Sequence, residues 1–269
     1  MTYNLTGEIL FTMRIALGVE YDGHGFYGWQ RQQHVPTIQE QVESALSKIA
    51  DEKIEVYCAG RTDRGVHATG QVIHFDTHAI RNLRAWVAGS NTHLPAAIAI
   101  RWAQQVDENF HARFSALSRR YRYVIYNHSV RPALMANRVT WYYHSLNIEP
   151  MQKAAQYFLG EHDFTSFRSA QCDSHSPMRC VHSMTVSREQ DQVIIEIEAN
   201  AFLHHMVRNI AGVLMHIGSG FEPIEWAEHV LTQKDRRLAA ETAPAAGLYL
   251  TYVSYPQQYD FQANMSSFS

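Results

Sequence analysis

Residues 54–75 read IEVYCAGRTDRGVHATGQVIHF, and this stretch sets the fold that we predict for the rest of the chain. Its first five and its last five residues alternate in polarity, which predicts two strands joined by a loop. Within the loop, Gly60 and Gly65 stand on either side of Asp63. Glycine tolerates positive φ and lets a ligand approach the backbone closely. The stretch therefore predicts a strand–loop–strand unit that presents one carboxylate.

Two arginines, Arg61 and Arg64, flank Asp63 in the sequence. An opposite charge close to a carboxylate favours its ionised form. An ionised aspartate near arginines, in a loop bordered by glycine, suits a nucleophile or an electrostatic stabiliser beside phosphates. The same residues also suit an ion-paired hairpin loop without chemistry, and the loop alone leaves both interpretations open.

The first half of the chain alternates between strand and helix patterns. Its predicted elements, apart from those around Asp63, are strands over 14–21 and 98–106 and helices from 36 onward and over 83–90. Thr37 and Glu40 have the spacing of a capping box. The glycine-rich aromatic loop 25–31 could equally stack bases or cover the edge of a core. The order of strand, helix, strand, strand and helix is close to the split βαβ pattern of ferredoxin-like folds.

Residues 110–125 form a long basic segment that favours a strand. Alternation places Arg119, Tyr121 and Tyr123 on one face. Arg120 and Arg122 lie on the other face. An aromatic face beside guanidinium groups suits an extruded base and its phosphates. An edge strand with half-buried tyrosines and solvated arginines would have the same pattern, so the strand alone does not decide between them.

The second half repeats this order loosely. Its predicted elements are helices over 151–159, 201–217 and 225–231 and strands over 181–187, 193–199 and 248–254. We interpret 127–145 as the crossover between the halves. Arg208 lies in a helix with apolar residues on both faces, so we expect it to meet a carboxylate or phosphate at a domain junction, or to form a structural salt bridge. Two similar α+β halves suggest an internal duplication with a cleft between them.

The composition is that of a globular protein, because 46% of the 269 residues are hydrophobic and 18% are charged. No apolar run reaches the ~18–20 residues of a membrane span, and residues 1–12 lack the basic start of a secretory signal. Three cysteines without framework spacing favour a reduced, cytoplasmic protein. The net charge of −3 argues mildly against nucleic acid, but all except four of the 23 basic residues are arginine, which binds phosphates and stacks on bases.

The sequence carries no recognisable metal or cofactor motif. Its 16 histidines include no His-Glu-x-x-His pattern. Cys172, His175, Cys180 and His182 lack the Cys-x-x-Cys spacing of a zinc knuckle. A phosphate-binding P-loop, a dinucleotide glycine fingerprint and a nucleophile elbow are also missing. We therefore predict chemistry without a metal or a cofactor.

Seven motifs, in the same order along the chain, resemble the tRNA pseudouridine synthase A (TruA) family. The Asp63 loop matches the family's catalytic loop, which reads Gly-Arg-Thr-Asp, any residue, Gly-Val-His. The other motifs are 20–23 with 28–31, 110–114, 119–123, 163–167, 202–209 and 247–250. The resemblance runs from about Met13 to Tyr255, nearly the whole chain, and seven motifs in order are far more specific than any one of them.

The resemblance implies an enzyme that isomerises uridine to pseudouridine on the 3′ side of the tRNA anticodon stem-loop. This reaction breaks the N1–C1′ bond, turns the uracil and joins C5 to C1′, so it consumes nothing and needs no cofactor. The uridine must first leave the helix stack. The resemblance also implies that the protein works as a homodimer.

The resemblance further implies roles for individual residues. The implied catalytic residues are Asp63, Arg61 and Arg208, and the implied substrate-binding residues are Tyr121, Leu248, Arg64 and His67. Asp63 would be the nucleophile, attacking either C6 of the base or C1′ of the sugar. Arg61 would help to hold the flipped nucleotide out, and Arg208 would pair with Asp63. Tyr121 would stack on the uracil, and Leu248 would form an apolar wall against it.

The predicted fold is α+β, with two similar ferredoxin-like (RRM-like) halves whose antiparallel sheets form one extended sheet with a central RNA-binding cleft. The predicted parts are an N-terminal extension 1–12, an N-terminal α/β domain 13–114 with the catalytic loop, a basic strand and crossover 115–149, a C-terminal α/β domain 150–256 and a polar tail 257–269. We expect this polar C-terminal tail to be loose.

Two other classes of function remain open on the sequence. An RNA-binding module without catalysis would use the basic and aromatic strand but would have no use for Asp63. A carboxylate hydrolase of nucleosides or glycosides usually needs a second carboxyl group as general acid. Asp22 is the only nearby candidate within a motif for that second carboxyl group.

Overall fold

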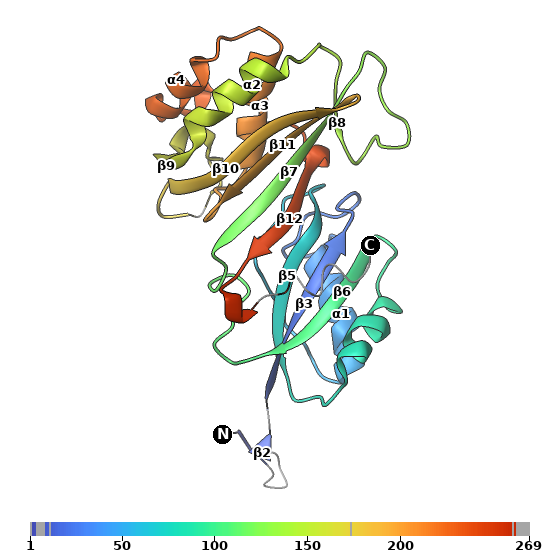
Figure 1. Cartoon of the computed structure of the whole chain (residues 1–269). Coiled ribbons are helices and arrows are strands. Elements are labelled where there is room, and N and C mark those ends of the chain that lie inside the picture. The colour runs from blue at the N-terminus through green and yellow to red at the C-terminus, as the bar shows by residue number, and fades with distance from the viewer. Residues whose placement is uncertain (1, 4–8, 11, 173, 260, 262–269) are drawn as a thin grey trace. The chain divides into compact units, whose positions relative to one another are not determined.

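The computed structural model describes residues 2–3, 9–10, 12–172, 174–259 and 261, and it confirms an α+β fold (Figure 1). The chain divides into two compact units, Met1–Leu117 with Val253–Ser269 and Ser118–Tyr252. Most of the predicted N-terminal extension lies outside the described residues, although β1 (Thr2–Tyr3) and β2 (Ile9–Leu10) pair with each other. The described part of the chain contains no helix that is long and apolar enough to cross a membrane.

The sheet of the first unit has β3 (Met13–Tyr21) at its centre, between the antiparallel strands β5 (His67–Thr77) and β6 (Ile98–Val106). The short strand β4 (Tyr57–Cys58) pairs with β5. The strands predicted over 14–21 and 98–106 are therefore confirmed. The two strands predicted on either side of Asp63 are also present. The first, predicted over 54–58, is paired only through its last two residues. The second, predicted over 71–75, begins earlier, at His67.

Two helical segments belong to the first unit. Helix α1 (Ile38–Ala50) buries an apolar face that includes Val42 and Leu46. Thr37 is its N-cap, but the Thr37 side chain makes no capping hydrogen bond and its hydroxyl finds no partner in the described part of the chain, so the predicted capping box is wrong. The predicted second helix is π-helical over Ala85–Gly89, and its Trp86 packs against Phe75 of β5 with ring centroids 5.1 Å apart.

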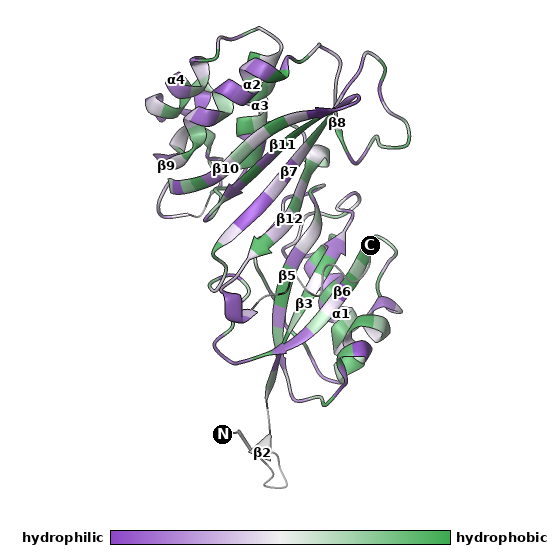
Figure 2. Cartoon of the chain, in the orientation of Figure 1, coloured by the Kyte–Doolittle hydropathy of each residue, from purple (hydrophilic) through white to green (hydrophobic). Residues whose placement is uncertain are grey.

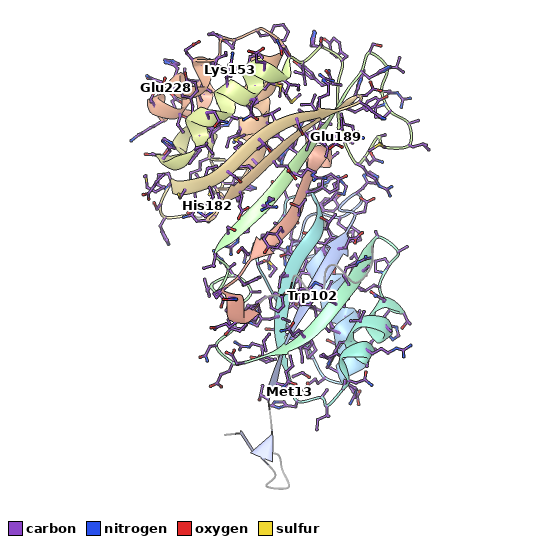
Figure 3. The ribbon with its side chains drawn as sticks, viewed as in Figure 1. Met13, Trp102, Lys153, His182, Glu189 and Glu228 are labelled. Carbon is purple, nitrogen blue, oxygen red and sulfur yellow. The ribbon has the colours of Figure 1, made fainter. Side chains whose placement is uncertain are left out.

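The C-terminal segment packs on this unit. Trp102 of β6 (Figure 3) lies opposite Gly18 of β3, where an added Cβ would come within 2.0 Å of the indole nitrogen. Phe261 stacks on Trp102 with ring centroids 4.7 Å apart, and the Tyr259 hydroxyl donates to the Asp107 carboxylate at 2.9 and 3.0 Å. The prediction of a loose polar tail is therefore wrong for residues 257–259 and 261, while 260 and 262–269 lie outside the described residues.

In the second unit, the neighbouring strands follow the order β12–β7–β11–β10–β9. These strands are β12 (Leu248–Ser254), β7 (Ser118–Asn127), β11 (Gln192–Ala199), β10 (Met178–Glu189) and β9 (Gly160–Asp163). A further strand, β8 (Thr140–Tyr142), pairs in parallel with the end of β7, so part of the predicted crossover contributes to this sheet.

Three helices lie on one face of the strands of the second unit, namely α2 (Ile148–Ala155), α3 (Met206–Gly218) and α4 (Trp226–Gln233) (Figure 1). Helix α2 begins before Pro150 because Asn147 accepts a capping hydrogen bond from the Glu149 amide. Helix α3 begins five residues later than predicted because His205 has a φ of 64°, outside the helical region. Short 3₁₀ helices complete the fold at Gln156–Phe158, Thr165–Phe167, Arg236–Leu238, Ala245–Gly247 and Gln257–Tyr259.

The basic strand β7 begins at Ser118 rather than at the predicted 110. It has neighbours on both sides, so the alternative of an edge strand is wrong. The predicted alternation is confirmed, since Tyr121 and Tyr123 are buried and the intervening arginines are exposed (Figure 2 shows the hydrophilic part of the strand). Each exposed arginine pairs with a glutamate of β11, and the pairs are Arg120–Glu198 at 2.7 Å and Arg122–Glu196 at 2.9 Å.

Candidate active site

The Asp63 loop connects β4 to β5 and ends in a tight turn. The carbonyl oxygen of Asp63 accepts a hydrogen bond from the Val66 amide at 3.1 Å, which closes the turn. Gly65 supplies the positive φ, 78°, that this turn requires. Gly60, for which we predicted the same freedom, is not among the glycines with positive φ. The turn leaves the Asp63 side chain half-buried.

Polar side chains of β3 and β5 hold the N-terminal part of the loop by hydrogen bonds. The hydroxyl groups of Tyr21 and Thr62 lie 2.7 Å apart, and both residues are buried. Gln71 of β5 donates to the Gly60 carbonyl at 2.6 Å and lies 3.4 Å from the Tyr21 hydroxyl. Polar groups that are buried and bonded to one another have few alternative positions. The residues on the N-terminal side of Asp63 therefore have a fixed geometry.

Two glycines of the neighbouring loop lie against the backbone of the Asp63 loop. A Cβ added to Gly28, where φ is 91°, would come within 2.8 Å of the Thr62 carbonyl oxygen. A Cβ added to Gly23 would come within 2.0 Å of the Val66 carbonyl oxygen. The Trp29 amide donates to the Thr62 carbonyl at 2.9 Å. The motif around residues 20–31 thus supports the Asp63 loop by close backbone contact.

The two arginines of the loop are exposed. The guanidinium carbon of Arg64 lies 4.2 Å from the centre of the Tyr27 ring, a cation–π contact. Arg61 lies close enough to Cys58 to affect its ionisation. Burial raises the pKa of the Cys58 thiol to about 12, and the positive charges of Arg61 and Arg113 oppose this rise. We predicted that both arginines lie near Asp63 and favour its ionised form, and this stays a prediction.

His67 is buried, with 2% of its surface exposed. Its Nδ1 lies 3.1 Å from the Gly23 amide nitrogen and 3.1 Å from Oδ1 of Asp22. One nitrogen cannot accept a hydrogen bond from Gly23 and donate one to Asp22 at the same time. We favour the neutral ring that accepts from Gly23, because an amide N–H at a buried position otherwise loses its partner. The structure thus places His67 as a support of the loop, and its predicted contact with substrate stays a prediction.

The other three predicted site residues belong to the second unit. Tyr121 of β7 is 8% exposed, and its ring meets Phe202 edge-on with centroids 5.0 Å apart. Nε of Arg208, on α3, donates to the Ala243 carbonyl at 2.8 Å. Leu248 is buried at the start of β12. Arg208 therefore anchors the segment that leads into Leu248.

The structure thus places four of the seven predicted residues at the Asp63 loop, with Arg61, Asp63 and Arg64 within it and His67 at the start of β5. It places the other three in the second unit. Sequence reasoning missed the supporting roles of Tyr21 and Gln71 and the contact of Tyr27 with Arg64. In the sequence, the only signal was that the two tyrosines, Tyr21 and Tyr27, lie within or beside the 20–31 motif. Cys172, His175, Cys180 and His182 do not form a group with converging ligand atoms in the part of the chain that the structure describes.

Comparison with known proteins identifies the family. A family model described as tRNA pseudouridine synthase matches residues 18–115 and 154–256. The tRNA pseudouridine synthase A of Legionella pneumophila (strain Corby) is 58% identical over 252 residues, which cover 94% of this chain and 96% of that protein. The protein of the same name from Histophilus somni (strain 2336) is 57% identical over 252 residues, or 94% of each chain. That from Shewanella sp. (strain MR-4) is 58% identical over 247 residues, or 92% of this chain and 95% of the relative.

The chain belongs to the tRNA pseudouridine synthase family. The TruA resemblance inferred from the motifs is thereby confirmed.

Proposed function

We propose that this chain converts uridine to pseudouridine on the 3′ side of the tRNA anticodon stem-loop, with Asp63 as the nucleophile. Its family membership makes it an isomerase that acts on tRNA. The observation that carries the residue assignment is the Asp63 loop, whose half-buried carboxylate follows directly after Thr62, a residue held by Tyr21. Holding the residue beside a nucleophile limits the positions of its carboxylate, and catalysis depends on the orientation of the reacting atoms.

The proposed reaction uses the carboxylate and returns it unchanged. Asp63 attacks either C1′ of the sugar or C6 of the base, and the N1–C1′ bond breaks. The uracil turns, C5 bonds to C1′, and the hydrogen on C5 leaves as a proton while N1 gains one. After attack at C1′, the bond between Asp63 and C1′ breaks as C5 takes its place. After attack at C6, the bond between Asp63 and C6 breaks when the C5 proton leaves and the C5–C6 double bond forms again. No oxidant, reductant or energy source is needed. Bonds and protons balance for attack at either carbon.

The residues of the second unit complete the proposal. Tyr121 would stack on the extruded uracil, a contact worth ~1–3 kcal/mol per base. Leu248 would pack against the same base, and Arg208 would pair with Asp63 to keep it anionic. On the first unit, Arg61 and Arg64 would contact the nucleotide and its phosphates.

The finer features of the fold and setting belong to the same proposal. We infer that each unit is a ferredoxin-like (RRM-like) half, that the halves share one extended sheet, and that RNA binds in a central cleft. We also infer that the enzyme works as a homodimer in the cytoplasm. The supporting argument is the TruA membership together with the α+β content of each unit.

The test is release of tritium from tRNA transcripts labelled at C5 of uracil. The unaltered protein should release tritium, because forming the C5–C1′ bond expels that hydrogen. Asp63→Ala should abolish release and keep tRNA binding within about tenfold, whereas Asp191→Ala, at an exposed turn, should behave like the unaltered protein. Undiminished release by Asp63→Ala would refute the nucleophile. Binding without release in the unaltered protein would favour the RNA-binding module instead.

A further inference from the structure

Residues 239–243 of the second unit pack against helix α3. A Cβ added to Gly212 of α3 would come within 2.3 Å of the Glu241 carbonyl oxygen, so the two backbones are in close contact. Ala240 and Ala243 of this segment are both buried. The segment therefore has a defined position against the helix.

Three polar side chains, Asn209, Arg236 and Thr242, hold this segment, and we call them the Asn209 network. Oδ1 of Asn209 accepts from the Thr242 hydroxyl at 2.7 Å and from Nη2 of Arg236 at 3.0 Å. Nη2 of Arg236 also donates to the Thr242 hydroxyl oxygen at 3.0 Å, and its Nη1 donates to the Ala240 carbonyl at 2.8 Å. The three side chains therefore bind one another and the backbone of the segment.

The hydrogen atoms of the network have one consistent arrangement. Arginine has donors and no acceptor, so the oxygen rather than the nitrogen of the Asn209 amide faces Arg236. Nδ2 of Asn209 then donates to the Phe167 carbonyl at 2.8 Å. Thr242 has one hydroxyl hydrogen, which it donates to Asn209, while its oxygen accepts from Arg236. Asn209 is fully buried, and buried polar groups that are paired with one another have few alternative positions.

The position of Arg236 is not explained by an ion pair. In the part of the chain that the structure describes, its hydrogen bonds all go to uncharged oxygens, those of Asn209, Thr242 and two backbone carbonyls. Burial lowers the pKa of Arg236, because its charge is partly removed from water. The neighbouring Arg237 is exposed and forms an ion pair with Asp235 at 2.6 Å. Arg236 therefore acts through the directions of its donors, and Arg237 offers a matched arginine outside the network.

Ala243 links the network to Arg208. It follows Thr242 directly, and it makes two hydrogen bonds with Arg208. Its amide donates to the Arg208 carbonyl at 3.2 Å, and its carbonyl accepts from Nε of Arg208 at 2.8 Å. A guanidinium is planar, so an acceptor fixed at Nε limits the plane and the directions of the other two nitrogens. A shift of Thr242 would therefore move the acceptor that orients the Arg208 guanidinium.

We propose that the side chains of the Asn209 network are positioning residues, which set the direction of the Arg208 guanidinium through the Ala243 carbonyl. This inference rests on the proposed function, in which Arg208 pairs with Asp63. An arginine–carboxylate pair depends on direction, because the N–H groups of the guanidinium have a fixed geometry. A turned guanidinium would leave Asp63 less well placed for attack and would lower kcat. The network itself takes no part in the chemical step.

The experiment compares tritium release with tRNA binding in variants of the full chain. Thr242→Val removes the hydroxyl and keeps the shape of the side chain, whereas Thr242→Ser keeps the hydroxyl. For Thr242→Val, kcat at 25 °C should fall about tenfold, while Kd from the fluorescence anisotropy of a labelled transcript stays within about twofold. Thr242→Ser should stay within about twofold of the unaltered protein in both values. A lower melting temperature of Thr242→Val with a normal kcat would overturn the proposal, because a network that only stabilises the fold gives that result.

Two control variants lie in the same unit. The Ser219 hydroxyl lies 2.7 Å from that of Tyr142 and donates to a backbone carbonyl 2.8 Å away, so Ser219→Ala also removes a hydroxyl with two partners. Its kcat should match that of the unaltered protein. Arg236→Gln should lower kcat as Thr242→Val does, whereas Arg237→Gln should not. Equal kcat values for Arg236→Gln and Arg237→Gln would contradict the role of the network.

A double variant tests whether the effect passes through Arg208. Arg208→Lys removes Nε, so the network has no guanidinium left to orient. Adding Thr242→Val to Arg208→Lys should therefore lower kcat by no more than about twofold, since residues that act through one another are not additive. A further loss of about tenfold would show that the network acts on something other than Arg208.

Hydrogen exchange of the Ala243 amide separates this proposal from the proposed function, because the measurement needs no RNA. Thr242→Val should speed this exchange about tenfold, and Ser219→Ala should not. Unchanged exchange in Thr242→Val would overturn the network, whatever the tritium assay shows. A lack of tritium release by the unaltered protein would refute the proposed function, while faster exchange in Thr242→Val would still support the hold of the network on Ala243.

Discussion

The hydroxyl of Tyr21 lies 2.7 Å from the hydroxyl of Thr62, so a buried residue of the central strand β3 fixes the residue that precedes Asp63. The Gln71 amide lies 3.4 Å from the same tyrosine hydroxyl. The position of the carboxylate thus depends on a hydrogen-bond chain that starts within the sheet. This arrangement makes the support of Asp63 testable apart from Asp63 itself.

Tyr21→Phe should lower turnover more than it lowers tRNA affinity. The substitution keeps the ring and removes the hydroxyl, so Thr62 and Gln71 each lose a buried partner, at a cost of ~1–3 kcal/mol. We expect kcat for tritium release to fall about tenfold and Kd to stay within about twofold. The matched control is Tyr142→Phe, which removes a hydroxyl that lies 2.7 Å from that of Ser219 in the second unit. Equal kcat values for both variants would contradict the supporting role of Tyr21.

Gly28→Ala should impair catalysis where Gly25→Ala does not. Both glycines have a positive φ, 91° and 88°, so the backbone strain by itself should cost each variant a similar ~1 kcal/mol of folding stability. An added Cβ at Gly28 would come within 2.8 Å of the Thr62 carbonyl, whereas one at Gly25 would meet nothing within 4 Å. We therefore expect Gly28→Ala to lower both the melting temperature and kcat more than Gly25→Ala does, with kcat measured at a temperature where both variants are folded. A similar kcat for the two variants would show that the close contact with Thr62 does not matter.

Local patterns were sufficient to predict most of the elements. The alternation over 98–106 predicted β6 with its actual bounds, because both faces of that strand follow the period of two. The start of α3 could not be predicted in the same way. His204 and His205 fit the helical pattern, but His205 takes a left-handed conformation that sequence periodicity does not detect.

Contacts between distant segments were the main source of error. The packing of Phe261 on Trp102 joins a strand to a tail that looks polar on average, so composition alone suggested a loose segment. The arginines of β7 looked available for phosphates because their partners, Glu196 and Glu198, lie more than 70 residues away in the sequence. The register of β11 against β7 creates these pairs, and one strand by itself does not reveal its register.

The stability of the protein should fall as the pH drops from about 6.5 toward 4. Burial lowers the pKa of His74 from 6.5 to about 4, so the unfolded chain binds a proton in this range that the folded protein does not. The stabilising contribution of neutral His74 is therefore complete above pH 6.5 and is lost as the pH falls through 4. His111, whose pKa is also lowered by burial, acts in the same direction.

Denaturant unfolding at pH 7 and pH 5 measures this effect. His74→Gln, which retains an acceptor for the Ala112 amide, should lose less stability between these pH values than the unaltered protein does. Asp76 does not interfere, since its lowered pKa affects stability only below the usual value of 3.8. Identical losses in the two proteins would rule out His74 as a source of the pH dependence.

Tyr121→Phe and Tyr121→Ala should separate stacking from the role of the hydroxyl. Phenylalanine keeps the ring and its edge contact with Phe202, so tRNA binding should stay within about twofold while turnover slows. Alanine removes the stacking surface, and both binding and turnover should fall about tenfold or more. Tritium release and anisotropy on the same transcripts measure the two effects. Normal rates in both variants would remove Tyr121 from the site.

Phe261→Ala should destabilise the first unit without changing the chemistry. Phe261 is 5% exposed, and its ring lies 4.7 Å from Trp102 and 5.5 Å from Phe110. Removing a buried phenylalanine ring leaves a cavity and costs ~3–5 kcal/mol. We expect a clearly lower midpoint in thermal unfolding, together with normal tritium release at 25 °C, where the protein is still folded. Phe221→Ala, at a ring that is 57% exposed, should change the unfolding free energy by only ~0.5 kcal/mol. If both variants melted like the unaltered protein, the C-terminal segment would contribute nothing to the core, and the original prediction of a loose tail would be restored.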